Sequence, residues 1–250
     1  MAFVLNSVVP WGRSFDEYRR MFCLEDRELQ KKIAGFGDGP ASFNCEAKEK
    51  GCSVTSFDPI YGFSKEQLEK RIEEVRVTVM QQMRENMDNY VWTQIKSLDE
   101  LENLRMSAMK RFLTDYDKGR QEGRYICHEL PKRLPYEDKA FDIGLSSHFL
   151  LMYTGLGYDF HVQTMTEMLR ACREIRVFPL VDLDANESEL AARVIQHFKA
   201  DFDVEIRKTQ YEFQKGDNKL LIIRNRQQRQ RKEDVNGKKT GSGKQVREHI

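Results

Sequence analysis

The fold is decided by the stretch Ile33-Ala34-Gly35-Phe36-Gly37-Asp38-Gly39-Pro40-Ala41. Its four leading residues are compatible with a short buried strand, and the Gly-Asp-Gly-Pro that follows is a turn. Residues 41–50 then predict a helix closed by Gly51, and Ser53-Val54-Thr55-Ser56-Phe57 reads as a second strand ending in Asp58-Pro59. A strand, a helix and a second strand within about 30 residues form the unit that builds parallel sheets.

Beyond this unit, strands and helices alternate along most of the chain. Short strands are expected at 124–127, 141–146 and 175–180, a helix capped by Asn186 after the last of these, and a closing antiparallel pair at 204–208 and 220–223. With about seven strands and crossover helices, the pattern predicts an α/β fold: a mostly parallel Rossmann-like sheet, helices on both faces and a C-terminal antiparallel hairpin.

Residues 64–118 interrupt this alternation with a predicted helical insertion after the second strand. Ser64 with Gln67 is a capping box, and an apolar stripe follows at helical spacing. Two interpretations of the insertion remain open, extra packing or a lid that forms a substrate wall.

Composition limits the partners of the protein. The 250 residues carry 41 Lys and Arg against 40 Asp and Glu, a net charge of +1, which argues against steering of the whole protein toward nucleic acid or an anionic membrane. From Arg224 to Ile250 there are nine basic and three acidic residues and few apolar ones. We therefore predict a domain over 1–225 and a basic disordered tail over 226–250, which is either a solvated segment or an RNA- or phosphate-binding arm.

Cysteine usage and hydropathy indicate a cytoplasmic location. The chain has five cysteines and no C-x-x-C, so neither a disulfide framework nor a structural zinc site is expected, and no histidine motif for a metal occurs. No apolar run reaches the roughly 20 residues that span a bilayer, and the N-terminus lacks the basic region and cleavage site of a signal peptide.

Gly37, Gly39 and Asp58 define the predicted binding site. Glycine lets the backbone turn sharply and lets a ligand approach closely. Asp58 follows the second strand, where an acid can accept hydrogen bonds from a ribose diol, and both features would meet at the carboxyl edge of the sheet. This order of elements predicts a ligand that contains a nucleoside.

These residues carry a resemblance to a known superfamily. The Ile33–Ala41 stretch resembles the first motif of class I S-adenosylmethionine-dependent methyltransferases, and Asp58 falls where they place their ribose-binding acid. Residues 134–142 resemble the stretch that leads into their fourth strand, and Ser146-Ser147-His148 follows where they line the cleft. The resemblance implies S-adenosyl-L-methionine as cofactor and Gly37, Asp38, Gly39, Asp58 and Ser147 among the residues that bind it.

More narrowly, three stretches resemble an uncharacterised bacterial branch of that superfamily: residues 39–46, residues 211–214 and Gly216-x-Asn218. One departure is Gly35, where many members carry an acid near the methionine part of the cofactor; here Asp38 would have to substitute from across the turn. A nicotinamide-binding fold is disfavoured, because the third glycine of its G-x-G-x-x-G motif would fall on Ser42.

Methyl transfer requires alignment of a nucleophile with the methyl group and, for a hydroxyl or an acidic carbon, a general base. His148 at the end of the fourth strand is the first candidate, although a residue at a helix start can also simply bond the backbone. His161 is the second. The resemblance further implies an adenine contact by Glu129 and places Arg13 in a segment that covers the cofactor, within reach of its carboxylate or that of a substrate.

The sequence thus predicts a methyltransferase that acts on a small molecule. Nucleic acid is disfavoured as the acceptor, because Ser146-Ser147-His148-Phe149 lacks the Asn/Asp-Pro-Pro-aromatic arrangement of amino-methyltransferases and the body of the chain is net acidic. The alternative is a non-catalytic nucleotide-sensing or scaffold protein that keeps the fold, with Gly35 as its main support. No oligomeric state is predicted.

Overall fold

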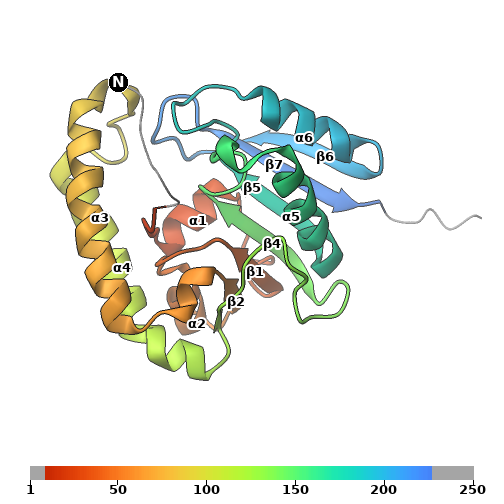
Figure 1. Cartoon of the computed structure of the whole chain (residues 1–250), viewed down its shortest axis with the longest axis horizontal. Coiled ribbons are helices and arrows are strands. Elements are labelled where there is room, and N and C mark those ends of the chain that lie inside the picture. Colours follow the sequence, from red (N-terminus) through yellow and green to blue (C-terminus); the bar gives the residue numbers. More distant parts are fainter. Residues whose placement is uncertain (1–8, 227–250) are drawn as a thin grey trace, which may run out of the picture.

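The computed structural model describes residues 9–226 and contains one seven-stranded sheet. The strand order is β3-β2-β1-β4-β5-β7-β6 (Figure 1). All neighbouring strands are parallel except β7, which is antiparallel to β5 and β6. The strands span Lys32–Phe36 (β1), Ser53–Phe57 (β2), Tyr125–Ile126 (β3), Phe141–Ser147 (β4), Cys172–Phe178 (β5), Phe202–Lys208 (β6) and Lys219–Asn225 (β7). This confirms the predicted mostly parallel sheet with its terminal hairpin; the predicted tail, beyond Arg226, lies outside the described residues.

Helices cover both faces of the sheet. On one face lie α1 (Phe15–Met21), α2 (Phe43–Glu49) and the inserted helices, and on the other α5 (Tyr158–Ala171) and α6 (Glu189–Lys199). Successive strand side chains point to opposite faces, so Ile33 of β1 packs in the first core while Ala34 and Phe36 pack in the second. Burial on both faces explains the apolar runs at residues 33–36 of β1 and 220–223 of β7.

The predicted insertion is a pair of long helices, α3 (Lys65–Glu85) and α4 (Leu98–Gln121), joined by the short 3-10 helix η2 (Met87–Asn89). They run side by side along the edge of the molecule (Figure 1). The capping box of Ser64 and Gln67 is present, and the buried residues of α3 form the expected stripe. One predicted cap is wrong: the side chain that caps α6 belongs to Ser188, which accepts from the Ala191 amide at 3.3 Å, and not to Asn186.

The register of the three central strands positions the site. Gly35 of β1 pairs with Ser56 of β2 on one side and with Leu145 of β4 on the other. All three strands therefore end at the same edge, and the residues that follow them are brought together there. Within residues 9–226, no helix has both the length and the apolar character to cross a bilayer, and the five cysteines are free thiols.

Candidate functional site

A cleft of about 410 Å³ opens at the carboxyl ends of β1, β2 and β4. Eight of the nine residues that the sequence singled out line it. They are Arg13, Gly37, Asp38, Gly39, Asp58, Glu129, Ser147 and His148. Parallel sheets bind ligands at this edge, so the position of the cleft agrees with the sequence-based expectation.

The turn after β1 requires its two glycines. Gly37 and Gly39 have φ of +68° and +58°, a region that side chains with a Cβ rarely adopt. A Cβ at Gly37 would lie 2.7 Å from the ring of Phe149, whereas one at Gly39 would meet nothing within 4 Å. The backbone at Gly39 is therefore open to a ligand in the cleft.

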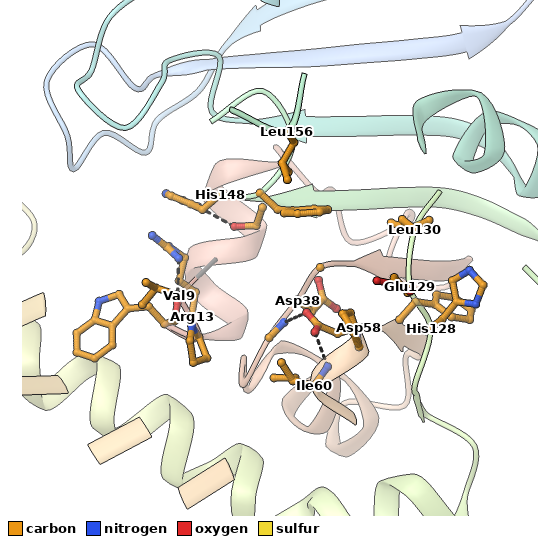
Figure 2. Close-up of a pocket in the computed structure, with 18 of the residues that line it drawn as sticks. Val9, Arg13, Asp38, Asp58, Ile60, His128, Glu129, Leu130, His148 and Leu156 are labelled. Carbon is orange, nitrogen blue, oxygen red and sulfur yellow. Dashed lines mark hydrogen bonds between the residues drawn. The ribbon is translucent and has the colours of Figure 1, made fainter. Parts of the chain in front are cut away.

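Asp58 is fixed beside this turn by two backbone hydrogen bonds. Its Oδ2 accepts from the Gly39 amide and its Oδ1 from the Ile60 amide, both at 2.9 Å (Figure 2). Burial raises the pKa of Asp58 to about 6, because a charged carboxylate is disfavoured away from water. Each carboxylate oxygen can accept more than one hydrogen bond, so the group is oriented and still able to receive donors from a ligand.

The Asp38 carboxylate lies directly over Gly35. A Cβ built on Gly35 would stand 1.8 Å from Oδ2 of Asp38. The carboxylate is held by the hydroxyl of Tyr18, which donates to Oδ1 at 2.9 Å, and by that of Ser56, which donates to Oδ2 at 2.6 Å. Burial raises the pKa of Asp38 to about 6, with a further contribution from Asp58. Asp38 thus occupies the space that a side chain at position 35 would fill.

His148 stands where β4 ends, in the left-handed backbone region with φ of +52°. Its amide donates to the Phe178 carbonyl at 2.7 Å, and its Nδ1 lies 2.8 Å from the hydroxyl of Ser147. Burial, followed by the positive charges of Arg13 and Arg105, lowers the pKa of His148 well below its ordinary value. The imidazole is therefore neutral at physiological pH and able to accept a proton.

Arg13 is a cation at the edge of the cleft. Its Nη1 donates to the Trp11 carbonyl at 3.0 Å, and its buried Nε has no hydrogen-bond partner in the described part of the chain. Among residues 9–226 no carboxylate lies within ion-pair distance of it. Figure 2 shows Arg13 and His148 at one end of the cleft, with Glu129 at the other and Asp58 between them. Gly12 brings the backbone of this segment against the turn, because a Cβ there would lie 2.1 Å from the Pro40 carbonyl oxygen.

Two sequence-predicted residues differ from the rest. Glu129 lines the cleft, but its exposed carboxylate pairs with Lys132 at 2.7 Å. His161 does not line the cleft: it is fully buried on α5, with Nδ1 2.6 Å from the Gly157 carbonyl oxygen, and its Nε2 has no partner. The structure therefore separates His161 from His148 and gives it a place in the core.

Sequence reasoning missed the apolar walls of the cleft, which include Ile60, Leu130, Phe149 and Phe160. In a sequence, such side chains cannot be told apart from core residues. Phe149 alone carried a signal, because it directly follows His148. Across residues 9–226, no group of three or more His, Cys, Asp or Glu side chains is arranged to hold a metal ion.

A sheet in this strand order, with β7 antiparallel and a glycine turn after β1, is the class I methyltransferase fold. No established protein-family profile matches the chain. Over 222 residues the chain is 38% identical to the uncharacterised protein MJ0045 of Methanocaldococcus jannaschii, a match that covers 88% of this chain and 97% of that protein. The chain belongs to the family of MJ0045. Because this relative is archaeal, the comparison does not support the bacterial branch expected from the sequence.

Among solved structures, the PH0226 protein of Pyrococcus horikoshii OT3 is similar, with 12% identity, coverage of 84% of this chain and 90% of that one, and a TM-score of 0.46. A SAM-dependent methyltransferase from Aquifex aeolicus has 9% identity, coverage of 83% and 90%, and a TM-score of 0.38. The mitomycin 7-O-methyltransferase MmcR has 13% identity, coverage of 85% and 54%, and a TM-score of 0.44. With TM-scores below 0.5, these likenesses do not by themselves establish an activity.

Proposed function

We propose that the protein is an S-adenosylmethionine-dependent methyltransferase that acts on a small molecule, and that residues 1–225 form its catalytic domain. The observation that carries the proposal is the open corner between Gly39 and Asp58, where a fixed carboxylate faces a cleft of about 410 Å³. The corner is not filled by side chains, because nothing lies within 4 Å of a Cβ built on Gly39. The residues present therefore fit a ribose with its two hydroxyl groups.

The remaining lining residues distribute along the cofactor in a consistent order. Asp58 would accept from the ribose hydroxyls, and the apolar side chains of Ile60 and Leu130 would enclose the adenine, with Glu129 at its rim. Asp38 would face the methionine part in place of the acid that Gly35 lacks, since its carboxylate occupies that space. Ser147 would line the same end of the cleft, and Arg13 would be within reach of a carboxylate there.

When bound, S-adenosylmethionine supplies a methyl group on a positively charged sulfur. The lone pair of the acceptor would form the new bond to the methyl carbon, and the electron pair of the broken C–S bond would stay on sulfur. His148 would accept the proton that the acceptor loses. Its neutral state is the one from which a base accepts a proton, and the Ser147 hydroxyl 2.8 Å from Nδ1 fixes the ring; the lowered pKa makes His148 a weaker base than a solvated histidine. Replacement of His148 by Asn should then lower turnover without loss of cofactor binding.

The alternative is a nucleotide-sensing or scaffold protein without catalysis. Its sequence support was Gly35, and the carboxylate of Asp38 in that space weakens it. Calorimetry with S-adenosylmethionine and S-adenosylhomocysteine tests the proposal: we expect binding of both, weakened by Asp58→Ala. If neither compound binds at millimolar concentration, the non-catalytic alternative is favoured over the methyltransferase. We further propose a cytoplasmic location, in keeping with five free thiols, and an acceptor other than nucleic acid.

A further inference from the structure

A second, smaller cavity of about 110 Å³ adjoins the cleft. The two share Val9, Trp11, Arg13 and His148 as a common wall. The inserted helices contribute Val79 and Met83 of α3 and Arg105 of α4 to the second cavity, and the loop between β6 and β7 contributes Phe213 and Asp217. The insertion therefore forms one wall of a compartment that opens beside the proposed base, as the substrate-wall interpretation requires.

The charges around this cavity are unbalanced. Arg105 is 1% exposed and pairs with Glu17 at 2.7 Å, but its Nε has no hydrogen-bond partner among the residues that the structure describes. Although burial opposes ionisation, Arg105 and Arg13 together hold the pKa of Glu17 below its ordinary value. Glu17 also accepts hydrogen bonds from Ser14 and Tyr211, and it makes no ion pair with Arg13. Two guanidinium groups, the buried Arg105 and the half-buried Arg13, thus lie near a single carboxylate that pairs with only one of them.

Asp217 is the acidic residue among those that line the cavity, and it is poorly suited to supply the missing charge. It is 1% exposed and accepts from the Phe213 amide at 3.1 Å. Burial raises the pKa of Asp217 to about 7, so a large fraction is neutral at physiological pH. A buried cation with an unsatisfied donor is costly unless an anion pairs with it.

We propose that the second cavity binds the methyl acceptor and that the acceptor is a small monocarboxylic acid, with its carboxylate held by Arg13 and Arg105 and its nucleophilic atom turned toward His148. The inference rests on the proposed function and names its substrate class. A single negative charge balances the excess of one guanidinium, whereas a phosphate dianion would overshoot it. The apolar lining and the volume limit the body of the acid, since a cavity of about 150 Å³ holds benzene.

The proposed acid site gives a role to the stretches at 211–214 and 216–218. Tyr211 donates to Glu17 at 3.1 Å and lies 3.4 Å from Arg105, so it holds the ion pair in place. Phe213, Gln214 and Asp217 line the cavity itself. These stretches would position the acid-binding groups, whereas the glycine turn serves the cofactor.

The test is a titration of matched acids and amides. Acetate and isobutyrate are compared with acetamide and isobutyramide, and with methyl phosphate, by calorimetry on the full chain with and without S-adenosylhomocysteine. We expect the acids to bind roughly tenfold tighter than the amides or more, the range for hydrogen bonds to a charged group. Equal binding of acids and amides, or tighter binding of methyl phosphate, would overturn the proposal.

Variants locate the binding site. Arg13→Gln should abolish the preference for acids, while Arg84→Gln, at an exposed position of α3, should leave it unchanged. Asp217→Asn, which removes a competing negative charge from the second cavity alone, should tighten acid binding; unchanged affinity in both Arg13→Gln and Asp217→Asn would refute the site. If S-adenosylhomocysteine binds and the acids do not, only the acceptor class fails. If the acids bind and S-adenosylhomocysteine does not, the cofactor proposal fails instead.

Discussion

Replacement of Gly35 by Ala tests whether the Asp38 carboxylate occupies the space of the missing side chain. Gly35 lies in β1 outside the left-handed region, so its backbone accepts alanine, but the new Cβ would stand 1.8 Å from Oδ2 of Asp38. The carboxylate would have to move by roughly 1.5 Å to reach normal contact, since non-bonded carbon atoms stay about 3.5 Å from their neighbours. That movement breaks the hydrogen bonds from Tyr18 and Ser56.

Two hydrogen bonds to a charged group at about 1.5 kcal/mol each give a loss of about 3 kcal/mol in the free energy of unfolding. For a domain of this size, that corresponds to a fall in Tm of roughly 6–12 °C, measured by circular dichroism. The same substitution in an Asp38→Ala background should cost less than about 1 kcal/mol, because the three atoms nearest to the new Cβ all belong to the Asp38 carboxylate. Gly155→Ala, where a Cβ meets nothing within 4 Å, is the matched control. Additive effects of the two substitutions would refute the reasoning.

Three further outcomes are expected. Asp58→Asn should weaken S-adenosylhomocysteine binding by about 1.5–3 kcal/mol in calorimetry, the range for hydrogen bonds to a charged group, and unchanged affinity would remove Asp58 from the site. In the wild type, the affinity for S-adenosylhomocysteine should be constant from pH 8 to 7 and should fall by up to about tenfold per pH unit below pH 6, because Asp58 with its pKa of about 6 takes up a proton. A fall that begins only near pH 4 would contradict the raised pKa. Folding raises the pKa of Asp217 to about 7, so its stabilising contribution is present at low pH and is lost as the pH rises through 7. Asp217→Asn should therefore flatten the dependence of Tm on pH between 5 and 8. Parallel Tm curves for the wild type and the variant would contradict the raised pKa.

The sequence predicted the sheet because each central strand is short, apolar and bounded by turn residues. It also located the cleft correctly, because the ends of parallel strands must meet at one edge, and Gly39 and Asp58 are indeed joined there by a hydrogen bond of 2.9 Å. Signals of this kind depend on residues that are close together in the chain, so a single sequence is enough to detect them. The capping box at Ser64, confirmed in α3, is another such signal.

Contacts between distant segments could not be predicted. The pairing of Glu17 with Arg105 joins residues 88 positions apart, and neither has a local pattern that distinguishes it from a surface charge. For His161 the local pattern was misleading. The residue follows an acid and an aromatic side chain, which made it the second candidate for the base, but the helical period of α5 places it in the core. Which face of a helix is buried depends on the element packed against it, and that is decided by the whole fold.

The segment from Val9 to Arg13 has a practical consequence. It forms part of the wall of both cavities and is fastened to the glycine turn where the Ser42 amide donates to the Arg13 carbonyl at 3.0 Å. Val9 and Pro10, the first residues that the structure describes, line the cleft, whereas β7 ends at the opposite edge of the sheet from the cleft edge of β5. Recombinant protein for ligand screening should therefore carry its purification handle at the other terminus.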